Sequence, residues 1–533
     1  MSQDLNQLCL EAFTHAEQGN MNLAIECFSQ ALMQAPDDAY LHNNLANAYK
    51  KQGDFAKAEA HYQQAIQINP SYAQAYNNLG SLYASANDYL RALNCYRLAV
   101  HTAPDFTLAH YHLGLLFLNH EKKQAAITQF SNVVALNPTH LQAYFYLGVL
   151  YLDQNQLDEA EQAFEEVLFI NSEHVDTLIN LGVIQLKRDR GQQAIDYFTK
   201  ALALDHDNQD ARNNLAATFI HHDRFENALT HYSVLLETYP NNIEYLYNIG
   251  VAKMTLGHIQ EAMIHFETLL KHNPNHFSSL VNLAAIHTRL EKRDQASALL
   301  TKAHEINPDD PACQFMLNAL QGHVKTDACP EYARHLFDNY ALYYDQHLNQ
   351  TLHYALPDLI AEAIQKFLKT PSEHTLDLGC GTGLTGVVLR NVSNTLSGID
   401  ISKKMLKQAE KKNIYDTLME SELIQFLNND PSQYHLIVSA DVLPYMGELD
   451  TLFKLIHERL CTQGLFIFNI EISDDAPWQL QKNARFSHHP SYLQQLISHY
   501  HFKVLQQKRV TARQQSGQDV PVLLYVLEAE PVS

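Results

Sequence analysis

The chain has 533 residues, of which 46% are hydrophobic and 18% are charged, a balance typical of globular proteins rather than disordered ones. This length predicts roughly two to four domains. Acidic residues outnumber Lys and Arg by 59 to 37, and the resulting net charge of −22 argues against a nucleic acid as substrate or partner.

The cysteines and the apolar segments argue against further classes of protein, namely metal-binding, secreted and membrane-spanning ones. The 7 cysteines are scattered without a CxxC pair or a Cys/His cluster, which predicts a reducing compartment and no metal site. No apolar run is long enough to cross a membrane, and the N-terminal segment lacks a basic region followed by an apolar one. We therefore expect a cytoplasmic protein without membrane insertion.

A small residue recurs every 34 residues in the N-terminal part of the chain. The recurring residues are Ala24, Ala58, Ala92, Ala126, Ala160, Ala194, Ala228, Ala262 and Ala296. A large ring follows four residues after eight of them, and Leu300 follows the ninth. Proline closes seven of the units, the first at Pro36 and the last at Pro308. We expect nine repeats that tile residues 5–310.

Two further positions indicate how each unit folds. A Leu-Gly or Leu-Ala pair, as in Leu147-Gly148, lets two helices approach each other, while the later ring fills the gap on the facing helix. Between the helices, one equivalent position carries types that tolerate a left-handed turn: Gly19, Gly53, Asn87, Asn155, Asp189, Asp223 and Gly257. The pattern resembles tetratricopeptide repeats over all nine units, which implies a right-handed α-solenoid with a concave face.

Asparagine precedes the Leu-Gly pair in six of the nine repeats: Asn44, Asn78, Asn180, Asn214, Asn248 and Asn282. An amide offers both a donor and an acceptor, so a row of amides suits an extended peptide backbone. The row is similar to the asparagine ladder of O-GlcNAc transferase, which implies a protein or peptide partner on the concave face. The alternative is a solvated asparagine, which is common at this position of such repeats.

The solenoid is expected to end before the chain's last two hundred residues. Pro311 to Val324 predicts one more amphipathic helix that caps the array. We therefore predict a solenoid over residues 1–324, a linker over residues 325–330 and a second domain over residues 331–533. The linker is short and lacks the Gly/Ser content of a free tether, so we expect the two domains to be held in a restricted arrangement.

The second domain contains a glycine loop. The apolar run Thr375 to Leu378 predicts a buried strand, and three glycines follow at alternate positions. Leu384 to Arg390 continues as a helix, so the loop opens onto unpaired helix amides. The apolar run Thr395 to Ile399 ends at Asp400, whose carboxylate can accept the hydroxyls of a ribose. The unit is typical of a cofactor site.

Two cofactors fit this unit. A dinucleotide fits because Gly381 to Gly386 also satisfies GxGxxG. S-adenosylmethionine is favoured by Asp377 inside the strand, by the tighter glycine spacing and by the segment Ile399 to Ala409. The whole segment resembles motifs I and II of class I S-adenosylmethionine-dependent methyltransferases. A loop that only turns the chain is the remaining alternative.

Strand candidates alternate with helices after the loop. They cover residues 415–419, 436–440, 465–470, 502–508 and 520–527, and the last two have no helix between them. A final antiparallel pair distinguishes class I methyltransferases from dinucleotide-binding folds. We therefore expect an α plus α/β multidomain protein, in which a tetratricopeptide α-solenoid precedes a Rossmann-like class I methyltransferase domain.

The methyltransferase resemblance implies a set of residues that bind the cofactor beyond the carboxyl ends of the strands. They are Asp377, Gly379, Cys380, Gly381, Thr382, Gly383, Asp400, Ile401, Met405, Glu422 and Leu423. We expect Glu422 at the adenine amino group and the Leu423 amide at the adenine ring. Leu336 to Leu348 resembles a helical motif of methyltransferases that carry tetratricopeptide repeats, which implies that Tyr340 and Tyr344 cover the cofactor as a lid. Core packing explains these two rings equally well.

The substrate side is expected after the later strands. Asp441 and Tyr445 follow the fourth strand, although a helix cap and a packed ring explain them equally well. Asn469 to Glu471 and Arg485 to Tyr492 resemble later motifs of the same family, which implies that Glu471, Arg485 and His488 border the substrate pocket. Asp441, Glu471 and His488 are the candidate bases, should the acceptor need one.

Three functions remain open at this point. The first is a methyltransferase whose solenoid recruits a protein or peptide. The second is a scaffold whose α/β domain has lost catalysis, against which the intact glycines and Asp400 argue. The third is a small-molecule methyltransferase, by similarity to quinone and acyl-carrier methyltransferases.

Overall fold

The computed structural model describes residues 3–323, 327–475, 477–515 and 518–531. The chain forms two compact units, Met1–Thr218 and Phe219–Ser533. No helix of the described residues is long and apolar enough to cross a membrane.

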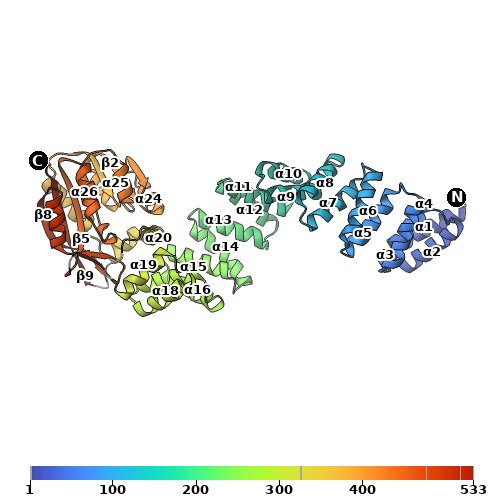
Figure 1. Ribbon diagram of the computed structural model, residues 1–533, viewed down its shortest axis with the longest axis horizontal. Coiled ribbons are helices and arrows are strands. Elements are labelled where there is room, and N and C mark those ends of the chain that lie inside the picture. The colour runs from blue at the N-terminus through green and yellow to red at the C-terminus, as the bar shows by residue number, and fades with distance from the viewer. Residues whose placement is uncertain (1–2, 324–326, 476, 516–517, 532–533) are drawn as a thin grey trace. The chain divides into compact units, whose positions relative to one another are not determined.

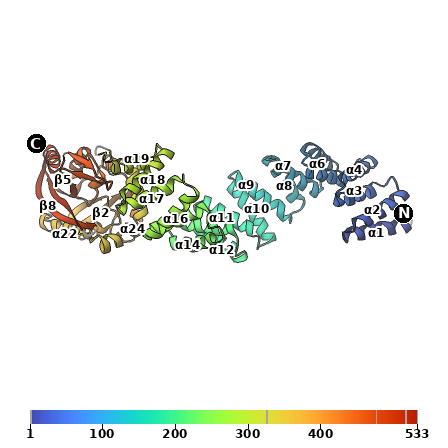
Figure 2. The ribbon, with the colours of Figure 1, turned by 90° about the horizontal axis from the view of Figure 1, so that it is seen from below.

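The first unit consists of helices, and helices that are neighbours in sequence pack side by side (Figures 1 and 2). They are α1 (Gln3–Glu17), α2 (Met21–Gln34), α3 (Ala39–Gln52), α4 (Phe55–Ile68), α5 (Ala73–Ser85), α6 (Tyr89–Thr102), α7 (Thr107–Asn119), α8 (Lys123–Leu136), α9 (Leu141–Asp153), α10 (Leu157–Ile170), α11 (Val175–Lys187), α12 (Gly191–Leu204) and α13 (Gln209–His221), in which the boundary between the units falls.

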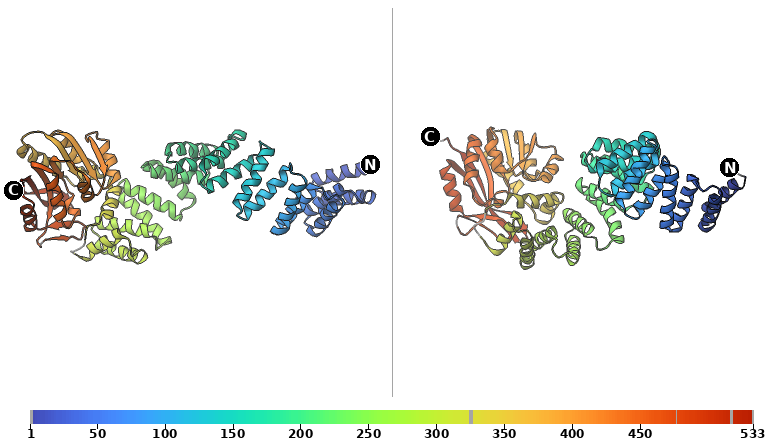
Figure 3. Two further views of the ribbon diagram at one scale, coloured as in Figure 1. Left: turned by 45° about the horizontal axis from the view of Figure 1, so that its top comes forward. Right: turned by 45° about the vertical axis from the view of Figure 1, so that its right-hand side comes forward.

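The second unit begins with the same kind of helical repeat and continues into an α/β domain, and Figure 3 shows the two side by side. Its repeat helices are α14 (Phe225–Thr238), α15 (Ile243–Thr255), α16 (Ile259–His272), α17 (Phe277–Arg289), α18 (Arg293–Ile306) and α19 (Pro311–Gln321). Helix α19 ends before Val324, which lies outside the described residues, as does part of the predicted linker.

The 34-residue pattern sets the packing of the repeats. The recurring alanines are fully buried, and the rings four residues later are at most 3% exposed. A Cβ added to Gly148 would stand 2.5 Å from a ring carbon of Phe164, and Gly80, Gly114, Gly182 and Gly250 meet the equivalent ring in the same way. The small residue therefore admits the facing ring, as predicted. The inter-helix position also adopts the expected positive φ, including 57° at Asp189 and 57° at Asp223.

The α/β domain has a mostly parallel sheet in the order β3-β2-β1-β4-β5, and β9 pairs antiparallel with both β5 and β8. Its strands are β1 (Ser372–Leu378), β2 (Ser393–Asp400), β3 (Thr417–Glu420), β4 (Tyr434–Ser439), β5 (Leu460–Ile472), β6 (Trp478–Leu480), β7 (Phe486–His488), β8 (Phe502–Gln515) and β9 (Gln518–Ala529). The predicted final antiparallel pair is confirmed as β8 and β9. The short β6–β7 hairpin, which joins the sheet beside the end of β5, was not predicted.

Helices cover both faces of this sheet. They are α22 (Leu356–Phe367), α23 (Leu384–Arg390), α24 (Lys403–Glu410), α25 (Leu423–Asn429), α26 (Asp450–Arg459) and α27 (Pro490–His499). Ahead of them in the chain, α20 (Pro330–Tyr340) contacts α15, α19 and α24, and α21 (Tyr344–Gln346) follows it; short π- and 3₁₀-helical turns lie at His347–Thr351 and Leu443–Tyr445. In β4, Leu436 and Val438 join one buried core while Ile437 joins the other, because side chains alternate along a strand. The sheet is thus buried on both faces, and its carboxyl-end edge remains for a ligand.

Candidate functional site

The glycine loop joins β1 to α23 at the carboxyl-end edge of the sheet. Its three glycines all adopt positive φ, with values of 70°, 54° and 87° along the chain. A Cβ at Gly379 would stand 2.3 Å from Val442, whereas a Cβ at Gly381 would meet no atom within 4 Å. Gly379 is therefore required by packing inside the protein, and Gly381 leaves open space on the outer side of the loop.

A cavity lies against this loop, and the space within it amounts to about 810 Å³ when its open mouth is counted. Each wall comes from a different part of the fold. The lining residues are Ala328, Cys329, Pro330, Ala333, Phe337, Tyr344, Gly379, Gly381, Asp400, Ile401, Met405, Glu422, Leu423, Ala440, Asp441, Val442, Tyr445 and Met446.

Asp400 ends β2 and fixes the loop. Its carboxylate accepts hydrogen bonds from the backbone amides of Gly381 and Ser402, both at 2.8 Å. Burial raises the pKa of Asp400 to about 6, although these amides oppose the shift. Each carboxylate oxygen keeps a further lone pair, so the group can still accept hydroxyl donors from a ligand in the cavity.

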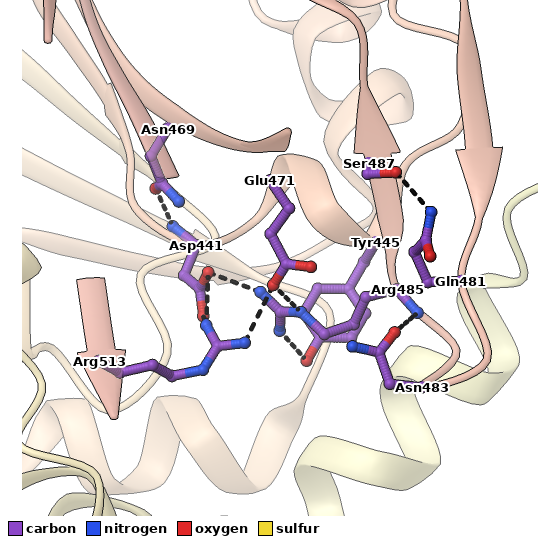
Figure 4. Close-up of polar contacts among 9 residues, drawn as sticks. All are labelled: Asp441, Tyr445, Asn469, Glu471, Gln481, Asn483, Arg485, Ser487 and Arg513. Carbon is purple, nitrogen blue, oxygen red and sulfur yellow. Dashed lines mark hydrogen bonds and ion pairs between the residues drawn. The ribbon is translucent and has the colours of Figure 1, made fainter. Parts of the chain in front are cut away.

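A buried cluster of charges, shown in Figure 4, includes Asp441, which lines the cavity. Arg485 donates to Asp441, to Glu471 and to the Tyr445 hydroxyl at 2.7, 2.7 and 2.8 Å. Arg513, from β8, reaches the same two carboxylates at 3.2 and 3.0 Å. These four charged side chains are at most 12% exposed. Two positive and two negative charges thus compensate each other within the cluster, which such burial requires.

Asp441 connects this charge cluster to the cavity. It is a non-glycine residue in the left-handed region, with φ 59°, and its amide donates to the Asn469 side chain at 2.7 Å. Burial alone would raise the pKa of its carboxyl, but Arg485 and Arg513 outweigh burial and hold the pKa below its ordinary value. Backbone strain of this kind persists where the surroundings over-determine it, often at functional sites.

Comparison with protein families matches the two parts of the chain separately. Tetratricopeptide-repeat models match residues 14–53, 39–72, 61–94, 111–174, 185–248 and 243–276. A methyltransferase-domain model matches residues 376–466, which contain the glycine loop and Asp400. The chain is a fusion of tetratricopeptide repeats with a methyltransferase domain.

Curated relatives are similar to parts of this fusion protein. A Geobacillus sp. (strain WCH70) protein named "Putative methyltransferase" is 24% identical over 25% of this chain and 57% of its own length. The probable S-adenosylmethionine-dependent methyltransferase CRG1 of Saccharomyces cerevisiae is 29% identical over 21% of this chain and 40% of its own length. The chain thus spans about half the length of the curated relatives it matches.

Solved structures similar to the chain include tetratricopeptide-repeat proteins. YrrB, described as a TPR protein with an unusual peptide-binding site, is 26% identical, with a TM-score of 0.33 over 35% of this chain and 97% of its own. MamA is 25% identical, with a TM-score of 0.29 over 30% of this chain and 95% of its own.

The fusion protein brings most of the expected cofactor residues to one cavity. Gly379, Gly381, Asp400, Ile401, Met405, Glu422, Leu423 and Tyr344 all line it. Asp377, Cys380, Thr382, Gly383 and Tyr340 do not. Asp377 is instead buried behind the loop, where it accepts a hydrogen bond from Tyr415 at 2.7 Å, and Thr382 donates to Asp345.

The wall opposite the sheet was only partly predicted. Phe337 and Tyr344 belong to the motif that suggested a lid, and both line the cavity. Ala328, Cys329 and Pro330 also line it, although sequence analysis assigned them to a linker. Their composition gave no signal of a binding role, because small and apolar residues before a helix are typical of any connection.

The three candidate bases differ in whether they line the cavity. His488 does not line the cavity: it is fully buried, its Nε2 contacts the Gly447 carbonyl at 2.9 Å, and burial lowers its pKa to about 4. Glu471 is held by both arginines of the cluster. Asp441 reaches the cavity, but its low pKa makes it a weak proton acceptor. Tyr445 also lines the cavity, whereas Arg485 does not.

The asparagine row lies half-buried on the repeats. Asn44 and Asn180 each donate to a backbone carbonyl four residues earlier, at 2.9 and 2.8 Å. Asn78 donates to Asn43 at 3.0 Å, and Asn248 donates to the Tyr232 hydroxyl at 2.9 Å. Asn214 and Asn282 are likewise half-buried. Each bonded amide retains a second N–H and its carbonyl for a partner.

Proposed function

We propose that the methyltransferase domain uses S-adenosylmethionine, and that the repeats recruit a protein or peptide as its acceptor or partner. The cavity beside the glycine loop supports this proposal most directly. Gly381 leaves room where a side chain would stand, and the Asp400 carboxylate lies next to it at the end of β2. Glu422 and Leu423 line the same cavity beyond β3, where an adenine contact is expected.

The residues of the site suit a reaction that needs alignment more than proton transfer. When bound, S-adenosylmethionine supplies an activated methyl group, so the domain mainly orients the acceptor and excludes water. Asp441 is a weak base in its arginine pair, and His488 is away from the cavity. This arrangement favours an acceptor atom that needs no strong base from the protein.

The cofactor assignment is tested by titration calorimetry of the full chain with S-adenosylmethionine and with NAD. Replacing Asp400 by Asn removes the charge and preserves the shape, so it should weaken S-adenosylmethionine binding by about 10- to 100-fold, as expected for lost charge-assisted hydrogen bonds. Asp358→Asn, at an exposed acid on α22, is the control and should bind normally. Preferential NAD binding, or unchanged affinity of Asp400→Asn, would contradict the proposal.

A further inference from the structure

The same edge of successive repeats contacts the methyltransferase domain within the second unit. Asp223 and Gly257 occupy the inter-helix turn of successive repeats, 34 positions apart, and Arg289 ends α17 just before the next equivalent turn. The Asp223 carboxylate pairs with Lys407 at 2.9 Å and with Lys404 at 3.4 Å, both on α24. Lys404 also lies 5.6 Å from the Phe225 ring centroid.

The other two positions contact an aromatic cluster, which consists of Tyr340, Tyr343, Tyr344 and His347. A Cβ added to Gly257 would stand 3.2 Å from Tyr343, so this turn lies directly against the ring. The Arg289 guanidinium carbon lies 5.0 and 5.1 Å from the Tyr340 and Tyr343 ring centroids. Arg289 also donates to the Tyr343 hydroxyl, and it contacts His347 at 3.2 Å.

Both contacted elements continue into walls of the cavity. Within the aromatic cluster, the Tyr340 ring packs edge-on against Tyr344 at 4.8 Å, and Tyr344 lines the cavity. On α24, Met405 lies between the two lysines that pair with Asp223, and it lines the cavity as well. Figure 1 shows α20 between α15 and α24, which it contacts on either side.

A direct link ties the two walls to each other. Asp338 of α20 accepts a hydrogen bond from the Ser402 hydroxyl at 2.6 Å, at the residue that caps α24. The repeat turns therefore support two elements that are already joined beside the cavity. A displacement of either element would change the position of Tyr344 or Met405.

We propose that the turns at Asp223, Gly257 and Arg289 form a brace that positions two walls of the cofactor cavity, the aromatic cluster and α24. The proposal deepens the proposed function, because it makes repeats beyond any recruiting surface part of the cofactor site. Arg289 and Gly257 act as positioning residues through the aromatic cluster, and Asp223 acts through α24. The repeats and the cavity are thus coupled by contacts that do not touch the cofactor.

The chain contains matched controls for these positions. Gly19 occupies the equivalent turn with φ 79°, close to the 82° of Gly257, but a Cβ there would meet nothing within 4 Å. Gly19→Ala and Gly257→Ala therefore introduce the same backbone strain, and only the second pushes on Tyr343. Asp189 has the same φ of 57° as Asp223 and makes no ion pair in the described part of the chain. Arg293 is an exposed arginine near Arg289.

Two measurements on the full chain test the brace. Amide hydrogen exchange in residues 330–351 should be about 3- to 30-fold faster in Gly257→Ala and Arg289→Gln than in Gly19→Ala and Arg293→Gln, the range expected for lost cation–π and ring contacts. The affinity for S-adenosylmethionine should fall by a similar factor in the brace variants alone. For α24, exchange in residues 403–410 should be faster in Asp223→Asn than in Asp189→Asn.

The outcomes separate this inference from the proposed function. If the unmodified chain does not bind S-adenosylmethionine, the proposed function fails, while the exchange data still decide whether the brace holds the two walls. If the brace variants exchange and bind as their controls do, the brace is wrong although the chain binds the cofactor. Faster exchange with unchanged cofactor affinity would also overturn it, because the contacts would then be structural only.

Discussion

Asp377 combines full burial with an incompletely satisfied carboxylate. Tyr415 bonds one oxygen, and the other lacks a partner among the described residues. Burial raises the pKa of Asp377 to about 7; the hydrogen bond from Tyr415 opposes this shift, and the Asp400 carboxylate adds a smaller upward contribution. The folded chain therefore binds this proton more tightly than the unfolded chain, so the free energy of unfolding falls as pH rises from about 4 to about 7.

Asp377→Asn should remove this pH dependence. Between about pH 5 and about pH 7.5, the unmodified domain should lose about 2–3 kcal/mol relative to the variant, because a shift of one pKa unit corresponds to about 1.4 kcal/mol. Urea unfolding followed by fluorescence measures this, since the single tryptophan, Trp478, lies in the β6 strand. Asp358→Asn should keep the original slope. Equal slopes in all three proteins would refute the prediction.

At the residue scale, the sequence indicated which residues lie at the cavity better than it indicated which side chains contact one another. The glycine spacing and the acid after the second strand placed Gly381 and Asp400 beside one cavity. Arg513 was missed for a structural reason. A register irregularity between Thr511 and Arg513 brings this arginine to a buried position, while Arg509, four residues earlier, stays exposed. A bulge of this kind has no reliable signature in one sequence.

Among the elements, the β6–β7 hairpin depends on the buried charge cluster. Arg485 lies directly before β7 and holds Asp441, Glu471 and Tyr445. Arg485→Met should lower the free energy of unfolding by about 3–5 kcal/mol, because the variant leaves two buried carboxylates with one arginine. Trp478 fluorescence in urea reports this directly, since the ring packs against Phe486. Arg509→Met, at an exposed position of β8, should change little, and equal midpoints would contradict the expected role.

The sequence predicted helices and strands correctly wherever a hydrophobic period or an apolar run extended over many residues. The repeat helices and β1, β2, β4 and β5 were predicted because each buries a continuous stripe or run. The hairpin strands have three residues each, Trp478–Leu480 and Phe486–His488, too few to show a period. Their pairing is stabilised by the end of β5 and by Phe315 of α19, which are distant in sequence. Local patterns therefore carried no signal for them.

For the whole molecule, recruitment of a protein or peptide by the repeats predicts that the methyl acceptor is a macromolecule. With radiolabelled S-adenosylmethionine and a cell lysate, label should appear in macromolecules rather than in small molecules. A double variant, Asn180→Ala with Asn214→Ala, should lower that label by about 3- to 10-fold, the loss expected for one or two hydrogen bonds, without changing cofactor affinity. Asn241→Ala, at an exposed turn, is the control. Label confined to small molecules would support the small-acceptor alternative instead.

The connection between α19 and α20 bears on how the methyltransferase domain can be joined to other repeats. Because Ala328, Cys329 and Pro330 line the cavity, this peptide cannot be exchanged as an inert spacer. A chimera that grafts a foreign recognition array just ahead of Pro330 would lose the turns at Asp223 and Gly257 as well. The smallest transplantable unit should therefore begin near Gln209, at the start of α13, because α13 and α14 flank the turn that carries Asp223.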